Sequence, residues 1–384
     1  MKQNSTGRKD GKRAKQASSV SKAKATGKGE RQLTIGLDLG DKSSCFCALD
    51  ETGEVLFERT VATTKKGLAQ VFGALARCRV ALEVGGHSPW VSRLLKCFGH
   101  EVIVANARQV KLITQSSRKN DKLDAHTLAR LARIDPELLR PIQHRSEAAQ
   151  QHLMMIRARA VLVEVRTALI NSARGLTKSL GERLPKCDAD QLDEQDLKEL
   201  PAGMTTALKP LLEEVGSITE KIHAYDEQIE QIARNEYPET ALLKQINGVG
   251  TLIAVTFVLT IEDPARFGKS RDVGCYVGLR PKRRESGESQ AQLGISKEGD
   301  VYLRKLLVQG AHGILGKRGP DTDLKRWGLQ LCARGGKNAR KRALVAVARK
   351  LGILLHRLWV TGEVYEPLRH GQANAAARAK TQAA

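Results

Sequence analysis

The alternation of hydrophobic and polar positions changes character along the chain. From residue 33 to residue 134, short apolar runs bounded by Gly, Asp and Asn indicate strands, and runs with apolar residues three and four apart indicate helices. In chain order they predict three strands, a helix, a strand, a helix, a strand and a helix. This order, with Asp38 near the centre of the first strand, is the pattern of an RNase H-like α/β sheet.

A different period begins at Ser146 and continues to residue 238. Apolar positions alternate spacings of three and four on both sides of a polar break from Pro185 to Pro201, which predicts two long helices with a heptad seam. An antiparallel coiled-coil hairpin or a dimerisation arm is the simplest interpretation, and a bundle packed within the chain is the alternative. The predicted seam consists of Leu153, Ile156, Ala160, Val163, Thr167, Ile170, Leu208, Leu211, Val215, Ile218, Ile222, Tyr225, Ile229 and Ile232.

The third region, residues 239–368, is predicted to be mainly helical. Its first segment, LLKQINGVGTLIAVTFVLTI, has the form of a helix-hairpin-helix, in which turn amides at Gly248 and Gly250 would bind a DNA phosphate. An ordinary helical hairpin with a glycine turn fits equally well. Helices at residues 301–315 and 343–358 are expected to complete this domain.

The two ends lack apolar periodicity. Residues 1–31 are rich in Lys, Arg, Ser, Gly and Ala and are predicted to be a disordered basic arm, and residues 369–384 a disordered tail. The expected organisation is therefore an arm (1–31), an α/β catalytic domain (32–145), a helical hairpin (146–238), a mainly α domain (239–368) and a tail (369–384).

Charge adds information about partners. The formal net charge is +22 over 384 residues, which predicts a polyanionic partner, most simply nucleic acid. Aromatic residues make up only 4%, so backbone contacts are favoured over base stacking. The segment GGKNARKRALVAVARK forms a further basic face for which DNA contact is favoured, with a solvated helix side as the alternative. Seven cysteines without a CxxC pair, no signal peptide and no long apolar run predict a cytoplasmic protein with no membrane partner.

Four carboxylates fall where metal chemistry would need them. Asp38 and Glu83 lie in predicted strands, and an unpaired Glu83 would be costly to bury in VALEV. Asp121 and Asp124 are three apart at a helix start and so share one face. Such a set can supply oxygen ligands to one or two Mg²⁺ ions. A helix cap is the alternative for Asp121, and a solvent-facing edge position for Glu83.

A hydroxyl-bearing turn, Glu285-Ser286-Gly287, lies between basic residues and a predicted helix. A serine among cations suits chemistry on a phosphodiester, with Ser286 as nucleophile. A basic surface loop is the alternative interpretation. The residues predicted to bind nucleic acid, with the two hairpin glycines, are Lys282, Arg283, Arg284, Lys297 and Arg304.

Together these motifs resemble the DEDD-type transposases of the insertion-sequence one-ten family, in particular its one-one-one-one subgroup. The resemblance spans residues 33–368, in the family's order. The matching segments are GLDLG, LEVGG, NDKLDAHTLARL, INGVG and VGLRPKRRESGE…LGISKEGDVYLRKLLVQGA. LEVGGHSPW departs from the commoner Glu, small residue, Thr-Gly and aromatic, and a serine loop one residue longer than usual leaves Ser289 as an alternative nucleophile.

The resemblance implies a RuvC-like domain with a Mg²⁺-binding tetrad (Mn²⁺ is also possible), a coiled coil, and a C-terminal transposase domain with a catalytic serine. The tetrad positions fall on Asp38, Glu83, Asp121 and Asp124, and the serine position on Ser286. It further implies a recombinase that joins element ends to target DNA through a phosphoserine link, guided by a structured noncoding RNA from the element. A homodimer or homotetramer, associated with the bacterial nucleoid when bound to DNA, is expected.

Two other functions remain open at this stage. A RuvC-like junction nuclease would hydrolyse DNA with metal-activated water and would need only the carboxylates. A noncatalytic nucleic-acid-binding protein with a decayed nuclease fold would need neither the tetrad nor the serine.

Overall fold

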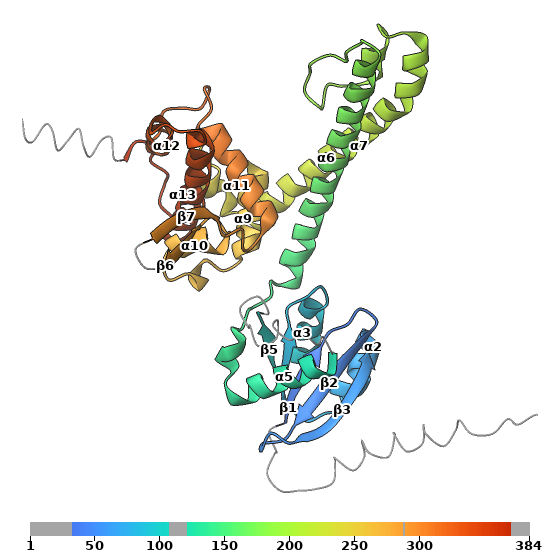
Figure 1. The fold of residues 1–384 in the computed structure, drawn as a ribbon, viewed down its shortest axis with the longest axis vertical. Helices are drawn as coiled ribbons and strands as arrows, with labels where there is room; N and C mark the ends of the chain where they lie inside the picture. Colours follow the sequence, from blue (N-terminus) through green and yellow to red (C-terminus); the bar gives the residue numbers. More distant parts are fainter. Residues whose placement is uncertain (1–32, 107–120, 287–288, 370–384) are drawn as a thin grey trace, which may run out of the picture. The chain divides into compact units, whose positions relative to one another are not determined.

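The computed structural model describes residues 33–106, 121–286 and 289–369, and within these ranges it leaves the side chains of residues 121–122 and 283–292 undescribed. The chain forms two compact units, residues 1–144 and 145–384 (Figure 1). The predicted basic arm (1–31) and the predicted tail after Arg369 lie outside the described residues.

The first unit is built on a mixed sheet of five strands in the order β3-β2-β1-β4-β5. Strand β1 pairs antiparallel with β2 and parallel with β4, and β4 pairs parallel with β5. The predicted succession of strands and helices is confirmed, and it is consistent with an RNase H-like domain. The elements are β1 (Thr34–Asp38), β2 (Ser43–Leu49), β3 (Val55–Ala62), α2 (Lys65–Phe72), β4 (Arg79–Glu83), α3 (Ser88–Cys97), β5 (Glu101–Ala105), α5 (Asp121–Ile134) and the 3₁₀ turn η1 (Pro136–Leu139).

Helices cover both faces of this sheet. On one face Ile35 and Leu37 of β1 pack in a core with Leu68 of α2 and Leu95 of α3. Successive side chains of a strand point to opposite faces, so Gly36 and Asp38 point to the other face. That face is covered by α5, which packs against β1, β2 and β4.

Contact between α5 and β1 is unusually close because residue 36 is glycine. A Cβ atom at Gly36 would lie 1.9 Å from the carbonyl oxygen of Ala125 and 2.5 Å from the amide nitrogen of Ala129. Without a side chain at residue 36, the backbone of the helix lies directly on the strand.

The second unit starts with two long helices, α6 (Glu147–Ser179) and α7 (Ala202–Glu236), joined through the short 3₁₀ turn η2 (Glu194–Leu197). Core residues near the start of α6 pack with residues near the end of α7, and those near the end of α6 pack with the start of α7, so the pair is antiparallel. Arg159 of α6 donates to the Asp226 carboxylate of α7 across this interface at 2.5 and 2.8 Å.

The buried positions of α6 and α7 depart in detail from the predicted seam. Leu212 is buried where Leu211 was expected, and Thr167 is exposed. A buried arginine takes a place in the interface, because Arg166 donates to Asp190 and, at 3.1 Å, to the Thr219 hydroxyl. Apolar spacing alone could not indicate a partly polar interface.

The remaining chain forms a helical core with one small sheet. Its largest cluster joins α9, α11 and α13 through side chains such as Phe257, Leu307 and Leu351. The elements are α8 (Thr240–Leu243), α9 (Thr251–Ile261), η3 (Pro264–Arg266), α10 (Arg271–Tyr276), β6 (Pro281–Ser286), β7 (Ser289–Ile295), α11 (Val301–Ile314), α12 (Asp323–Ala333) and α13 (Ala339–Thr361). Within the described ranges, none of the helices is both long and apolar enough to cross a membrane.

The antiparallel pair β6–β7 is absent from the sequence-based prediction, which placed a turn at Glu285-Ser286-Gly287. Its strands, PKRRES and SQAQLGI, are mostly polar and lack alternating apolar positions. A ribbon of this kind is formed by backbone pairing, so the hydrophobic pattern gives no signal for it.

Candidate active site

Two carboxylates lie next to each other at one edge of the first unit's sheet. The parallel register of β1 and β4 pairs Leu37 with Leu82. The next residue on each strand is the last one, Asp38 on β1 and Glu83 on β4. Because this register is parallel, both side chains belong to the same edge of the sheet and to the same face.

Helix α5 meets that face and runs opposite to both strands. At its C-terminal end, the backbone carbonyl of Ala132 accepts a hydrogen bond at 3.1 Å from Arg79, the first residue of β4. At the middle of β1, Gly36 touches Ala125. The N-terminal turn of α5, which carries Asp121 and Asp124, therefore lies at the edge where β1 and β4 end.

The described carboxylates at this edge, Asp38, Glu83 and Asp124, are half-buried, and the side chain of Asp121 lies outside the description. Asp38 and Glu83 each have a polar or electrostatic partner. Among the described side chains, no group of three or more His, Cys, Asp or Glu residues lies close enough to form a metal site. Carboxylate oxygens at one edge are nevertheless the donor type that Mg²⁺ and Mn²⁺ take in proteins, so the residue types fit such an ion.

A histidine that the sequence reasoning missed joins the two loops at this edge. Asp41 follows β1 and His87 follows β4, and His87 Nε2 lies 3.3 Å from Asp41 Oδ1. Trp90 Nε1 lies 3.1 Å from His87 Nδ1. An indole N–H can only donate, so Nδ1 is the acceptor and the imidazole proton is on Nε2, directed at the Asp41 carboxylate. The GGHSPW motif was visible in the sequence, but its partner is 46 residues away.

A cavity of about 600 Å³ opens beside the carboxylate edge. Cys45, which pairs with Asp38 across β1 and β2, lines it together with Glu58, Thr60 and Ala125 of α5. Glu58, Arg59 and Thr60 of β3 give this cavity a polar side.

Ser286 is the last residue of β6 and pairs with Ser289, the first of β7. The base of this hairpin is held firmly: Ser296 N donates to Arg280 O at 2.8 Å and Lys297 N donates to Gly278 O at 3.0 Å. The predicted nucleophile thus sits at the far end of a two-stranded ribbon that is anchored at its base.

The predicted cations around the serine differ in accessibility. Lys282 and Lys297 are exposed, and Lys297 adopts a left-handed backbone conformation with φ of 59°. The side chains of Arg283 and Arg284 lie outside the description. Arg304 is buried, and its guanidinium donates to the carbonyl of Val277 at 3.0 Å and to that of Glu298 at 2.7 Å.

These bonds give Arg304 a structural role, which corrects the expectation that it contacts nucleic acid. The side chain turns inward because the carbonyl groups of Val277 and Glu298 take up its guanidinium donors.

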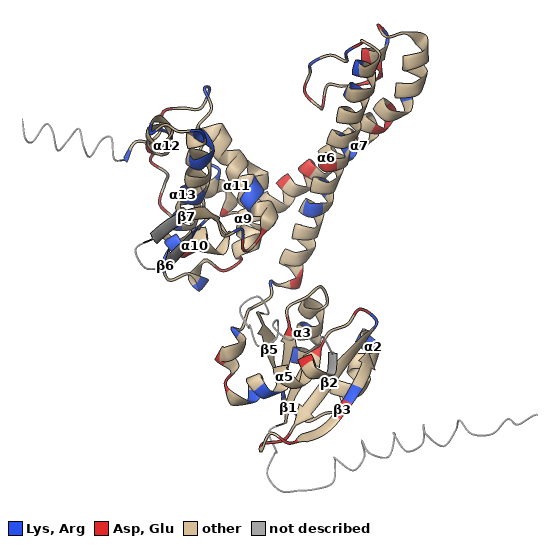
Figure 2. Cartoon of the chain, viewed as in Figure 1, with Lys and Arg blue, Asp and Glu red and all other residues tan. Residues whose placement is uncertain are grey.

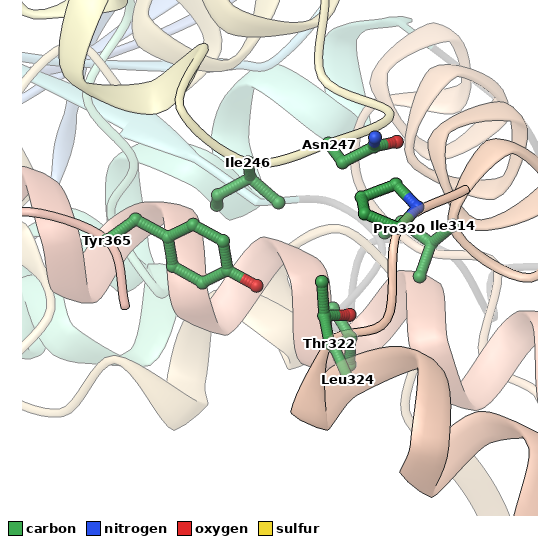
Figure 3. A pocket seen from close by; sticks show the side chains of 7 residues that line it. All are labelled: Ile246, Asn247, Ile314, Pro320, Thr322, Leu324 and Tyr365. Atoms are coloured by element: carbon green, nitrogen blue, oxygen red, sulfur yellow. The ribbon is translucent and has the colours of Figure 1, made fainter. Parts of the chain in front are cut away.

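The turn predicted as a helix-hairpin-helix connects α8 to α9. Gly248 has φ of 86° and lies against α11, where an added Cβ would come 2.8 Å from Gly310 O. Gly250 is exposed and caps α9. Figure 3 shows Asn247 over Pro320, in a small pocket closed by Thr322 and Tyr365. Gly248 is therefore packed against α11, whereas Asn247 and Gly250 are exposed.

Comparison with known proteins agrees with these features. Residues 35–180 match the DEDD transposase family of IS110, and residues 240–324 match the family described as Transposase IS116/IS110/IS902. The transposase for insertion sequence element IS1111A of Coxiella burnetii is 30% identical over 339 residues, covering 86% of this chain and 90% of that protein. A probable family 20 transposase of Pseudomonas aeruginosa is 28% identical over 341 residues, covering 87% and 98%.

A further relative is the transposase for element IS1328 of Yersinia enterocolitica, 27% identical over 284 residues and covering 72% of this chain and 82% of that protein. Both family matches contain the residues singled out above: the first includes the carboxylate edge and the second includes Ser286. The chain therefore belongs to the IS110 family of insertion-sequence transposases and is a DNA transposase.

Proposed function

We propose that this transposase cuts and rejoins DNA through a covalent link to Ser286, with a divalent metal ion held by Asp38, Glu83, Asp121 and Asp124. The observation that supports this most directly is the convergence of Asp38, Glu83 and the N-terminal turn of α5 on one edge of the sheet. The family suggests divalent metal dependence, and the carboxylate donors favour Mg²⁺, with Mn²⁺ as a substitute.

The bound ion would supply charge stabilisation at the scissile phosphate. The chain's own residues do the rest. Asp38 and Glu83 are held by strand pairing, so their oxygens are preorganised by the fold rather than by the ligand. Asp124 is held by α5, whose position depends on the Gly36 contact.

In the covalent step, Ser286 Oγ attacks phosphorus and loses its proton. The bond from phosphorus to the departing ribose oxygen breaks, and that oxygen gains a proton and becomes a free hydroxyl end. One phosphodiester is exchanged for another, so neither water nor ATP is consumed. Attack by a hydroxyl of the other DNA reverses the link and joins donor to target.

Nucleic-acid contacts would come from Lys282, Arg283, Arg284 and Lys297 around the serine hairpin, and from the Gly250 end of the helix-hairpin-helix. A structured noncoding RNA would pair with donor and target DNA. The α6–α7 pair would act as a coiled coil that sets a homodimer or homotetramer. Action in the bacterial cytoplasm, on nucleoid DNA, follows from this function.

A covalent trap tests the serine. Wild type, Ser286→Ala and Ser289→Ala are incubated with element-end DNA, the element's noncoding RNA and Mg²⁺, and resolved on a denaturing gel. Ser289 is the matched control because it faces Ser286 across the hairpin. An adduct present in wild type and Ser289→Ala but absent from Ser286→Ala supports the proposal.

Cleavage without any adduct, unchanged in Ser286→Ala, would instead establish a hydrolytic junction nuclease. That alternative has one observation in its favour, since the carboxylate edge is assembled entirely within residues 1–144 and does not need the serine.

In the assembled complex, the serine of one subunit would complete the carboxylate site of another. Co-expression of Ser286→Ala with Asp124→Asn tests this arrangement. Recovery of adduct formation in the mixture, with none in either variant alone, supports completion of the site between subunits. Failure to recover any activity contradicts it.

A further inference from the structure

The α12–α13 segment carries the most one-sided charge in the described chain. Between residues 324 and 362 there are ten Lys or Arg residues and no Asp or Glu. The segment is folded, not a tail: it comprises α12, the turn at residues 334–338, and α13 (Figure 2). Its charge therefore has a fixed location in the second unit.

Several of these cations are used by the fold. Arg326 pairs with Asp321, Arg357 pairs with Glu363, and Lys350 lies 4.3 Å from the ring centre of Trp327. Such residues are satisfied within the chain and are poorly placed to bind a second molecule.

Four cations at the turn are different. Arg334, Lys337, Arg340 and Lys341 are all exposed, and within the described residues none of them forms an ion pair. We call these four residues the basic turn. Ala339 and Ala343, on the other side of the same helical turn, are buried, so α13 is anchored while its cations face solvent.

The cations of the basic turn destabilise the N-terminal end of α13. The first turn of α13 has basic residues and no acidic one, and its N-cap, Asn338, makes no side-chain capping bond. Cations near a helix N-terminus oppose the helix dipole, so the sequence here lowers local stability. A surface that costs stability and repels itself indicates an anionic partner.

The aromatic side chains of the α12–α13 segment limit the kind of nucleic acid that it can bind. The aromatic residues of this segment, Trp327 and Trp359, both pack against the hydrophobic core. Without an exposed aromatic side chain, the segment has no platform on which unpaired bases can stack. Cations alone fit the regularly spaced phosphates of a duplex.

We propose that the basic turn binds the phosphate backbone of duplex DNA, as a contact surface separate from the serine hairpin. The proposal rests on the chain's DNA substrate, which its family establishes, and not on the serine chemistry. It adds a second anchoring point that positions the duplex without reading its sequence.

The test compares two triple charge reversals in the full-length protein. Lys337→Glu, Arg340→Glu and Lys341→Glu together reverse three of the four charges of the basic turn. Lys178→Glu, Lys198→Glu and Lys221→Glu change the net charge equally at three exposed lysines of the α6–α7 region. Binding to a duplex is measured by fluorescence anisotropy from about 50 to 200 mM salt, with a single-stranded RNA of equal length as a parallel probe.

We expect the basic-turn variant to lose at least tenfold in duplex affinity at the lowest salt and its log–log salt slope to fall by about 2 to 3, because each phosphate contact contributes about 0.9. The control variant should keep the wild-type slope. Because glutamate favours a helix N-terminus, the basic-turn variant should melt no lower than wild type, which separates lost binding from lost folding.

Equal slopes for the two variants would overturn the proposal, as would a loss confined to the RNA probe, which would assign the surface to RNA. Adduct formation at Ser286 is scored separately. Absence of adducts in wild type would defeat the serine chemistry and leave the affinity comparison intact.

Discussion

The carboxylate edge and the serine hairpin are built in opposite ways. Asp38 and Glu83 end central strands of a sheet with a helix on each face, and their neighbours Leu37 and Leu82 are fully buried. Ser286 ends a strand that, within the described part of the chain, pairs with just the other strand of the same ribbon. An isolated two-stranded ribbon is only marginally stable in water.

This difference in construction matches the different roles proposed for the two regions. The charged centre, which would be costly to assemble during the reaction, is fixed by the core of the first unit. Ser286, the proposed nucleophile, is carried on a ribbon anchored at its base, which would let it adapt to bound DNA. The following predictions test this contrast.

The largest expected effect is on catalysis at the edge. Asp38→Asn should reduce DNA strand cleavage by at least about 10²-fold, because a neutral amide is a far weaker ligand for a divalent ion. Glu54→Gln, in the turn at the opposite end of the sheet, is the matched control and should cleave at the wild-type rate. Equal activity of the two variants would contradict a carboxylate centre at Asp38.

A smaller effect is expected on the free energy of unfolding, where an added methyl group should matter in β1 and not in β7. Gly36→Ala places a Cβ 1.9 Å from Ala125 O, so either the strand or α5 must shift, at a cost of about 1 to 3 kcal/mol or more. Gly294→Ala in β7 meets nothing within 4 Å and should change the free energy of unfolding very little. Thermal denaturation of both variants measures this, and equal melting temperatures would refute the difference in packing.

The bridge between His87 and Asp41 should have an intermediate effect on metal use. His87→Ala removes the link between the loops that follow β1 and β4, and the Mg²⁺ concentration for half-maximal cleavage should rise roughly tenfold. His87→Gln keeps a donor and should recover part of the loss. A lower maximal rate at unchanged Mg²⁺ dependence would show that His87 acts elsewhere.

The smallest effect concerns buried thiols of the first unit. Burial raises the pKa of Cys78 to about 12 and that of Cys47 to about 11, from an ordinary value of 9.0. Both thiols therefore stay protonated and slow to alkylate near pH 8, whereas the exposed Cys97 should react readily.

The same shifts predict a pH dependence of stability. A folded-state pKa above the unfolded value means that the folded state holds the proton more tightly, so this contribution is complete below pH 9 and is lost as pH rises through about 11 to 12. The free energy of unfolding should fall across this window. A flat profile, or rapid labelling of Cys78 in native protein, would contradict the burial of these thiols.

Much of the secondary structure of the first unit could be predicted from the pattern of apolar and polar residues. The strand and helix order, and the placement of Asp38 and Glu83 in strands and Asp121 and Asp124 at a helix start, follow from periodicity, because neighbouring residues determine which side of an element is apolar. The long helices α6 and α7 were predicted for the same reason. Family membership was also within reach, since it depends on the motifs and their order.

Only the tertiary structure decided what those elements build. The register that sets Asp38 beside Glu83, the direction of α5 and the bridge from His87 to Asp41 join residues far apart in the chain, and no local pattern encodes such pairings. The polar β6–β7 ribbon was missed because backbone pairing forms it without an alternating apolar pattern. The inward turn of Arg304 was missed because the carbonyl groups it satisfies are brought together only by the fold. Local periodicity determines where helices and strands form. Long-range packing and the pairing of backbone groups determine which side chains come together at the candidate site.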